Sequence, residues 1–133
     1  MRTLLLAQSG ITSLLGSSPG VFVSRVAQGA VLPAIRIYGI NEKGMQGLSD
    51  AFAQTWQGDL DIDCYGNDED ESAEVGEAVN AYLDSVLNVT VNGRLIQSCH
   101  VVSRQEESLA TFGGSDRDVQ VVTLTFQITH TGD

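Results

Sequence analysis

Cysteine is scarce in this chain of 133 residues, which contains only Cys64 and Cys99. They stand far apart, without a Cys-x-x-Cys spacing and without a second pair of ligands nearby, so a structural zinc site is not indicated. Two cysteines also make no disulfide framework. We therefore expect two half-buried thiols in a reducing compartment, in a fold that needs no covalent cross-link.

Long hydrophobic runs are missing as well. The only apolar stretch near the start runs from Thr3 to Ala7 and is broken by Gln8 and Ser9. It is far shorter than the roughly 20 residues that a membrane-spanning helix needs, and it suits the apolar region of a signal peptide poorly. We expect a soluble, intracellular protein with no membrane partner.

Basic residues are few compared with acidic ones. The chain has 7 Lys or Arg against 17 Asp or Glu, which gives a formal net charge of −10. A surface of that sign repels phosphate backbones and anionic lipid headgroups. General nucleic-acid binding and peripheral membrane binding are therefore disfavoured.

Groups that could perform catalysis are also sparse. His100 and His130 are the only histidines, and Cys99 and His100, adjacent in an expected strand, point to opposite faces and cannot act as nucleophile and base. The glycines of 44–47 and 113–114 lack the spacing and the Lys-Ser/Thr of a phosphate-binding loop. We expect no enzyme, no catalytic residue and no cofactor.

The hydrophobic pattern predicts one domain, 1–133, of the α+β class. Helical spacing of apolar residues predicts helices over 2–15 and 67–87, and Asp68 with Glu71 has the spacing of a capping box. Period-2 alternation predicts a mainly antiparallel sheet of about four strands, with both helices packed on one face. The expected order is α-β-β-α-β-β, with strands over 34–40, 55–65, 95–103 and 119–129. Two long loops, 41–54 and 105–118, complete the prediction.

Three aspartates alternate along the second expected strand. Asp59, Asp61 and Asp63 occupy one face, spaced roughly 7 Å apart. A Ca²⁺ or Mg²⁺ site draws its ligands from a tight loop or from several elements, so this line is a poor metal site. It is either a solvated sheet face or a charged wall that faces a partner or a space through which something passes.

Charge is unevenly distributed along the chain. No Lys or Arg occurs between Lys43 and Arg94, while acidic residues crowd between Asp59 and Glu77. A folded monomer is then acidic on one side and less acidic on the other. Such asymmetry suits head-to-tail association that closes into a ring.

Several strings resemble a known family in their order and spacing. They are Leu14-Leu15-Gly16, Val21-Phe22, the segment from Arg25 to Ala30, the segment from Leu32 to Tyr38, the strand from Asp61 to Tyr65 and the last strand from Val119 to His130. Together they cover nearly the whole chain. The sequence resembles the tail terminator or tail completion proteins of long-tailed bacteriophages, also called minor tail or tail-to-head joining proteins.

The resemblance implies a structural protein of virion assembly. Members of that family form a hexameric homo-oligomeric ring that caps the head-proximal end of the tail tube and ends its polymerisation. The ring then presents a surface to the head connector, and DNA passes through its opening without specific binding. The resemblance therefore implies a place at the head-tail junction of the virion tail, after assembly in the host cytoplasm, with no small-molecule substrate.

Candidate site residues follow from the pattern and the resemblance together. We expect Asp59, Asp61 and Asp63 to line the lumen or an acidic face. The loops are expected to contact the tube, the connector or the next subunit through Lys43, Met45, Leu48, Phe52, Leu109, Phe112 and Arg117. Arg25 is expected to pair with an acidic group across the subunit boundary. Two alternatives stay open: an acidic DNA mimic or inhibitor that binds a basic partner, and a small enzyme or metal-binding domain that uses the aspartates.

Overall fold

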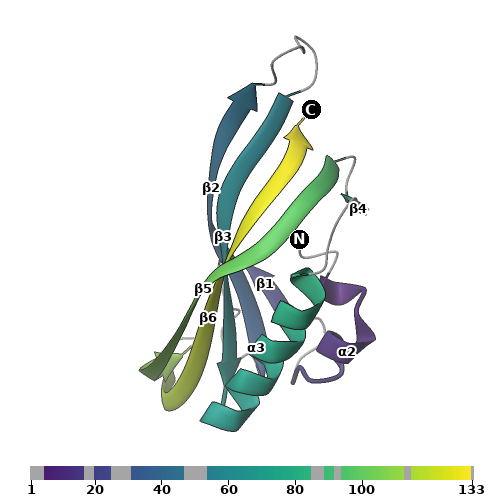
Figure 1. Cartoon of the computed structure of the whole chain (residues 1–133). Coiled ribbons are helices and arrows are strands. Elements are labelled where there is room, and N and C mark those ends of the chain that lie inside the picture. The colour runs from purple at the N-terminus through teal and green to yellow at the C-terminus, as the bar shows by residue number, and fades with distance from the viewer. Residues whose placement is uncertain are drawn as a thin grey trace.

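Six strands form one long twisted sheet, with the helices packed beside its lower half in Figure 1. The computed structural model describes residues 5–16, 20–24, 31–46, 54–84, 89–91, 94–112 and 115–132. The strands are β1 (Val21–Val23), β2 (Ala34–Gln46), β3 (Gln54–Gly66), β4 (Val89–Val91), β5 (Arg94–Phe112) and β6 (Ser115–Gly132), and the helices are α2 (Ser9–Thr12) and α3 (Glu69–Leu83).

The sheet is mixed, and its spatial order is β1-β2-β3-β6-β5-β4. Strand β1 runs parallel to β2, whereas the other neighbouring pairs are antiparallel. The last strand of the chain, β6, thus lies in the middle, between β3 and β5. The four long strands β2, β3, β6 and β5 form the body of the sheet, and the two short strands lie at its edges.

The predicted fold class is wrong. The chain is mostly β, with six strands in a mixed sheet, and does not have about four mainly antiparallel strands in the order α-β-β-α-β-β. Strands β1 and β4 have three residues each, too few for an alternating pattern to stand out. Strand β1 is held by parallel pairing with Ile35–Ile37 of β2, a contact that local sequence does not reveal.

The two segments predicted as long loops are largely strand. Strand β2 continues to Gln46 and β3 begins at Gln54, so the two form a long arm. Strand β5 continues to Phe112 and β6 begins at Ser115, which makes a second arm. In the picture the β2–β3 arm rises beyond the helices (Figure 1). Residues 41–46 and 103–108 show no alternation of apolar residues, so the pattern gave no signal there.

Helix α3 begins with the capping box that the sequence predicts. The Asp68 carboxylate accepts the Glu71 backbone N–H at 2.8 Å, and Glu71 Oε1 accepts the Asn67 backbone N–H at 3.3 Å. These bonds satisfy donors that the first helical turn leaves free. The helix then runs from Glu69 to Leu83, shorter than the predicted 67–87, and residues 85–88 lie outside the described part.

The predicted N-terminal helix is interrupted. Within the predicted span 2–15, residues 5–6 are helical, Gln8 has an extended backbone, and α2 then covers Ser9–Thr12. Residues 1–4 lie outside the described part of the chain. Leu5 and Ile11 are buried nonetheless and join the main core. Within the described residues, no helix has the length and apolar character to cross a membrane.

The main core lies between α3 and one face of the sheet, which we call the helix face. Ile35, Ile62 and Phe126 come from three strands, and Val75 and Val79 come from α3. The helix approaches the sheet closely at two glycines. A Cβ on Gly76 would lie 3.2 Å from the Val122 side chain, and a Cβ on Gly66 would lie 2.5 Å from the Ser72 backbone nitrogen.

Replacing Gly66 by alanine should destabilise the fold. The added methyl group meets backbone at the start of α3, so the helix must shift, and overpacking of this kind costs about 1–3 kcal/mol of unfolding free energy. The measurement is urea denaturation followed by circular dichroism. Gly10→Ala is the control, because a Cβ there meets nothing within 4 Å. Equal stabilities for the two variants would contradict the close approach.

Alkaline pH should also destabilise the fold, partly through Cys99. Burial, and then the charge of Asp84, raise the pKa of the Cys99 thiol from 9.0 to about 11. Between those values the unfolded chain loses the proton while the folded chain keeps it, so stability present below pH 9 is lost as pH rises. Burial raises the pKa of Cys64 in the same direction.

A Cys99→Ala variant should therefore lose about 2 kcal/mol less unfolding free energy than the parent between pH 8 and 11. Denaturation curves across that range measure the difference. Ile128→Val trims the register partner of Cys99 without removing a titrating group, so it should keep the parent's pH dependence. Parallel curves for the parent and Cys99→Ala would show that the pKa of the thiol is the same in the folded and the unfolded chain.

Candidate functional site

The strand register brings the three aspartates to the face of the sheet opposite α3, which we call the aspartate face. Asp59, Asp61 and Asp63 of β3 stand opposite Gln127, Thr125 and Thr123 of β6, respectively. Alternate residues of a strand point to the same side. The aspartate face therefore carries a double row of polar residues, while their neighbours along the same strands belong to the main core.

Asp63 is the centre of a hydrogen-bonded network that joins three strands. Its Oδ2 accepts from Arg36 Nε at 3.1 Å, from Arg36 Nη2 at 2.7 Å and from Tyr65 Oη at 2.9 Å. Its Oδ1 accepts from Thr123 Oγ1 at 2.6 Å. The carboxylate is only 3% exposed. A buried charge is tolerated when it is paired and hydrogen-bonded, and here both conditions hold.

The charges of this network tune its two tyrosines. Burial, and then the negative charge of Asp63, raise the pKa of Tyr65, so that its phenol stays a hydrogen-bond donor. Burial, and then Asp63 and Asp61, also raise the pKa of Tyr38. The Arg36 guanidinium lies 4.0 Å from the centre of the Tyr38 ring, a cation–π contact. Arg36 is thus held between a carboxylate and an aromatic ring.

The three aspartates are not equivalent. Asp63 is buried and paired, Asp61 is partly buried and accepts from Thr125 Oγ1 at 2.6 Å, and Asp59 is exposed. The net negative charge that this row offers to solvent is smaller than the sequence suggests and is greatest at Asp59. In the described part of the chain, no three His, Cys, Asp or Glu side chains converge as metal ligands would.

Beyond Asp63, the aspartate face becomes apolar. Leu32, Ala34, Tyr65, Val119 and Val121 form a second buried cluster, against which Phe22 and Leu109 pack. Leu109, a predicted interface residue, is thus partly buried against its own chain. This cluster anchors the base of the β5–β6 arm.

The remaining predicted interface residues divide into two groups. Arg25, Leu48 and Phe52 lie outside the described residues. Lys43 and Met45 belong to β2, with Gln57 and Thr55 as their register partners on β3. Phe112 and Arg117 belong to the ends of β5 and β6 in the second arm. The two arms therefore hold these four residues in strands, where loops were expected.

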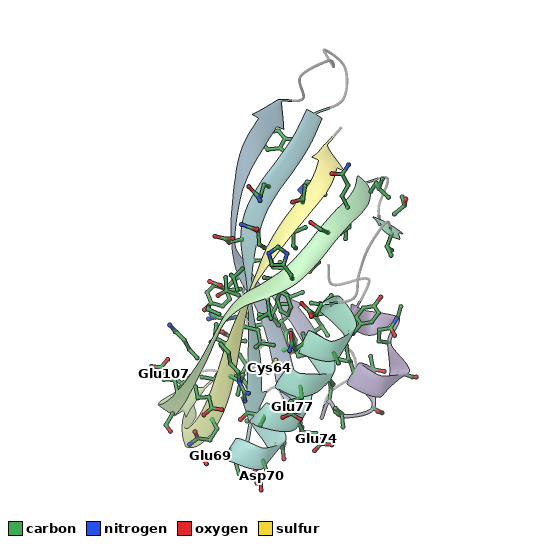
Figure 2. All side chains as sticks on the ribbon, in the orientation of Figure 1. Cys64, Glu69, Asp70, Glu74, Glu77 and Glu107 are labelled. Atoms are coloured by element: carbon green, nitrogen blue, oxygen red, sulfur yellow. The ribbon has the colours of Figure 1, made fainter. Side chains whose placement is uncertain are left out.

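Other acidic residues lie on the opposite side of the molecule. Glu69, Asp70, Glu74 and Glu77 are exposed along α3, away from the aspartate face (Figure 2). A pocket of about 250 Å³ separates the start of α3 from the β5–β6 arm and is lined in part by Glu69, Glu106 and Glu107. Among the described residues, the acidic groups therefore occupy two sides of the molecule.

Sequence reasoning identified the aspartate row but missed the partners of Asp63. Arg36 and Thr123 lie 27 and 60 positions away in the chain. A partial signal existed, because threonines alternate in the last strand as the aspartates do in β3. The signal could not be used without the register that sets Thr123 opposite Asp63.

Asp63→Asn should cost about 2–4 kcal/mol of unfolding free energy, because it leaves Arg36 without its charged partner and directs an amide donor toward other donors. Asp59→Asn makes the same chemical change on the same strand at an exposed site and should stay within about 0.5 kcal/mol of the parent. Chemical denaturation measures both. Similar losses would show that the buried network does not carry the difference.

The chain is similar to a known protein family and to solved structures. The family model described as "Tail completion protein gp17" matches residues 1–131. The fold is similar to a chain in the solved structure described as "Virion of native gene transfer agent (GTA) particle", with a TM-score of 0.73 and 12% identity over 98% of this chain and 92% of that chain. No curated protein sequence matches the chain. The chain belongs to the tail completion protein gp17 family and is a structural component of a virion tail.

Proposed function

We propose that this protein forms a ring of about six copies that caps the head-proximal end of a tail tube. The ring ends polymerisation of the tube and offers its other side to the head connector, and DNA passes through the opening. The observation that carries the proposal is the two-sided sheet: one face is sealed by α3, whereas the other presents Asp59, Asp61 and their threonine and glutamine partners. In a tail completion protein, the aspartate face then lines the channel.

The chemistry of the aspartate face suits a channel wall for DNA. Asp59 is exposed and Asp61 partly so, and their charge repels phosphates at close range. Asp63 contributes little repulsion, since Arg36 neutralises it. Threonine hydroxyls and amides supply a hydrated surface, and the Arg36 guanidinium on this face is already paired with Asp63. DNA can therefore slide past such a wall.

The two arms are the parts of the fold best placed to reach neighbouring components. Strands β2 and β3 extend beyond the helix-covered core, and β5 and β6 extend from its other end (Figure 1). We assign contacts with the tube, the connector or the next subunit to these arms, with Lys43, Met45, Phe112 and Arg117 in the strands. Arg25, Leu48 and Phe52 keep their proposed interface role from the sequence.

Reversing the charge at Asp59 tests the channel assignment. The Asp59→Lys ring should retain linear duplex DNA at low salt, with an affinity that falls as salt is raised, and the corresponding particles should lose infectivity about tenfold or more. Fluorescence anisotropy of labelled DNA, with native mass spectrometry of the ring, measures the first effect.

Glu77→Lys is the matched control, because it makes the same charge change on exposed α3, outside the proposed channel. It should assemble and release DNA as the parent does. If both lysine variants retain DNA equally, the aspartate face does not line the channel. If the parent stays monomeric both alone and with tail-tube protein, the ring itself is wrong.

A further inference from the structure

The long strands β2 and β5 are each covered along only a short part of their outer edge by the short strands β1 and β4. On one side, β1 covers Ile35–Ile37 of β2. On the other side, β4 covers Arg94–Ile96 of β5. Within the described residues, no other strand pairs with the outer edge of β2 beyond Ile37 or of β5 beyond Ile96. An uncovered edge is a row of backbone donors and acceptors ready to pair with another chain.

Irregularities divide these edges into segments. The register of β2 shifts between Tyr38 and Asn41 and is regular from Asn41 to Gln46. The register of β5 shifts between Val101 and Ser103, and again between Leu109 and Thr111, so the run from Ser103 to Leu109 is regular. Each outer edge therefore offers one regular segment, and the two are similar in length. Regular segments can form an uninterrupted ladder, whereas a bulge interrupts pairing.

The β5 segment is uncovered on its faces as well. Every residue from Val102 to Ser108 is exposed, and Val102 is 52% exposed although it is apolar. Beyond β4, few residues of α3 contact β5, and the Val101 backbone N–H donates to Oδ1 of Asp84, the C-cap of α3, at 3.4 Å. From there the strand diverges from the helix (Figure 1). The exposed backbone edge of this segment is therefore open to pairing with a neighbouring chain.

The direction of the strands makes the two edges complementary. Strands β2, β3, β6 and β5 alternate in direction across the sheet. When copies are arranged around an axis, β5 of one copy therefore meets β2 of the next in antiparallel orientation, which continues the alternation. The two edges belong to opposite sides of the sheet, so the contact is head-to-tail and closes into a ring. Closing a sheet around an axis requires that neighbouring strands be staggered along their length. In the ring, this stagger brings Ser103–Leu109 of β5 level with Asn41–Gln46 of β2 of the next copy.

Face and charge select one register. Asn41 is the register partner of Asp59, so positions 41, 43 and 45 belong to the aspartate face, as do positions 103, 105 and 107 of β5. Lys43 must then stand opposite an odd-numbered residue of that run. If Lys43 stood opposite Gln105, Glu42 would stand opposite Glu106. Like charges directly opposite each other are destabilising, so this register is disfavoured.

In the register that sets Lys43 opposite Glu107, the two side chains carry opposite charges, and Glu42 stands opposite the neutral Ser108. This register also keeps the whole of Asn41–Gln46 within the regular run of β5, whereas pairing of Lys43 with Ser103 would carry β2 into the bulge near Val102. Among the described side chains, Arg104 is paired with Glu106 at 2.9 Å, and Glu107 takes part in no ion pair.

We infer that Asn41–Gln46 of one copy pairs antiparallel with Arg104–Leu109 of the next copy, with Lys43 directly opposite Glu107. The occupant of each edge is thus a second copy of this chain. The inference rests on the proposed ring and adds to it the strands, the direction and the register of the subunit boundary.

Charge reversal tests the register. Lys43→Glu and Glu107→Lys should each weaken association by about fivefold per interface, since each replaces an attraction by a repulsion. The double variant carrying both changes exchanges the charges and should return association to within about twofold of the parent. Arg104→Glu with Glu106→Arg is the control, because it exchanges a pair inside one strand. Native mass spectrometry across a concentration series measures association.

Disulfide trapping tests the same contact geometrically. Residues directly opposite in an antiparallel pair have Cα atoms about 4.5–5.5 Å apart, within the range that a disulfide spans. Lys43→Cys with Glu107→Cys should cross-link adjacent copies in the assembled ring, and Lys43→Cys with Gln105→Cys should cross-link far less. The native thiols at Cys64 and Cys99 are buried and do not compete.

The outcomes separate this inference from the proposed function. A ring that assembles without cross-linking at either position, and without rescue by the charge exchange, overturns the edge pairing and leaves the ring in place. Cross-linking only between Lys43→Cys and Gln105→Cys overturns the register. The absence of any ring, alone or with tail-tube protein, overturns the proposed function itself.

Discussion

The buried carboxylate of Asp63 fixes how the central strands are aligned. It accepts hydrogen bonds from Arg36 on β2, from Tyr65 on its own strand and from Thr123 on β6. A slip of one residue in either pairing would turn every side chain of that strand to the other face. Arg36 or Thr123 would then turn to the helix face, and the buried carboxylate of Asp63 would lose that partner. The network therefore fixes the register of β2, β3 and β6, which form the aspartate face and continue into the arms.

The helices cover only part of the sheet, and this division shapes the molecule. Where α3 packs, each strand needs an apolar side, and Gly66 and Gly76 let the helix approach closely. Beyond α3, the strands are held by backbone pairing and are free to carry polar or charged residues on both faces. The chain thus combines a dry core with two extended ribbons, an arrangement that suits contacts between subunits better than enclosure of a ligand.

Much of the fold could be predicted where burial imposes a pattern. The alternation around Asp61 and along the last strand identified the middle of β3 and β6, and the Asp68–Glu71 spacing identified the start of α3. The arms were missed because residues 41–46 and 103–108 show no alternation of apolar residues. Residues 21–23 could be predicted as a brief extended piece but not as a strand of the sheet, and β4 was missed because three residues are too few to show a period.

The candidate site was predictable as a set of residues but not as an arrangement. Alternation alone places the three aspartates on one side of a strand. Their different exposure depends on Arg36 and Thr123, which come from other strands and are located only by register. Local sequence therefore reveals a row of charge, and only the folded sheet reveals that its inner member is neutralised.

The position of β6 has a consequence for how the chain reaches this state. Strand β6, which follows the other five described strands in the chain, lies between β3 and β5, and it supplies Thr123 to the Asp63 network. A nascent chain lacking its final segment can form α3 and the β2–β3 ribbon, but its sheet is split in two and Asp63 lacks one donor. Such long-range pairing is slow to form. Folding of the sheet is thus completed only once β6 is available to pair, and chains that terminate before β6 cannot form the continuous sheet whose two edges complete copies present.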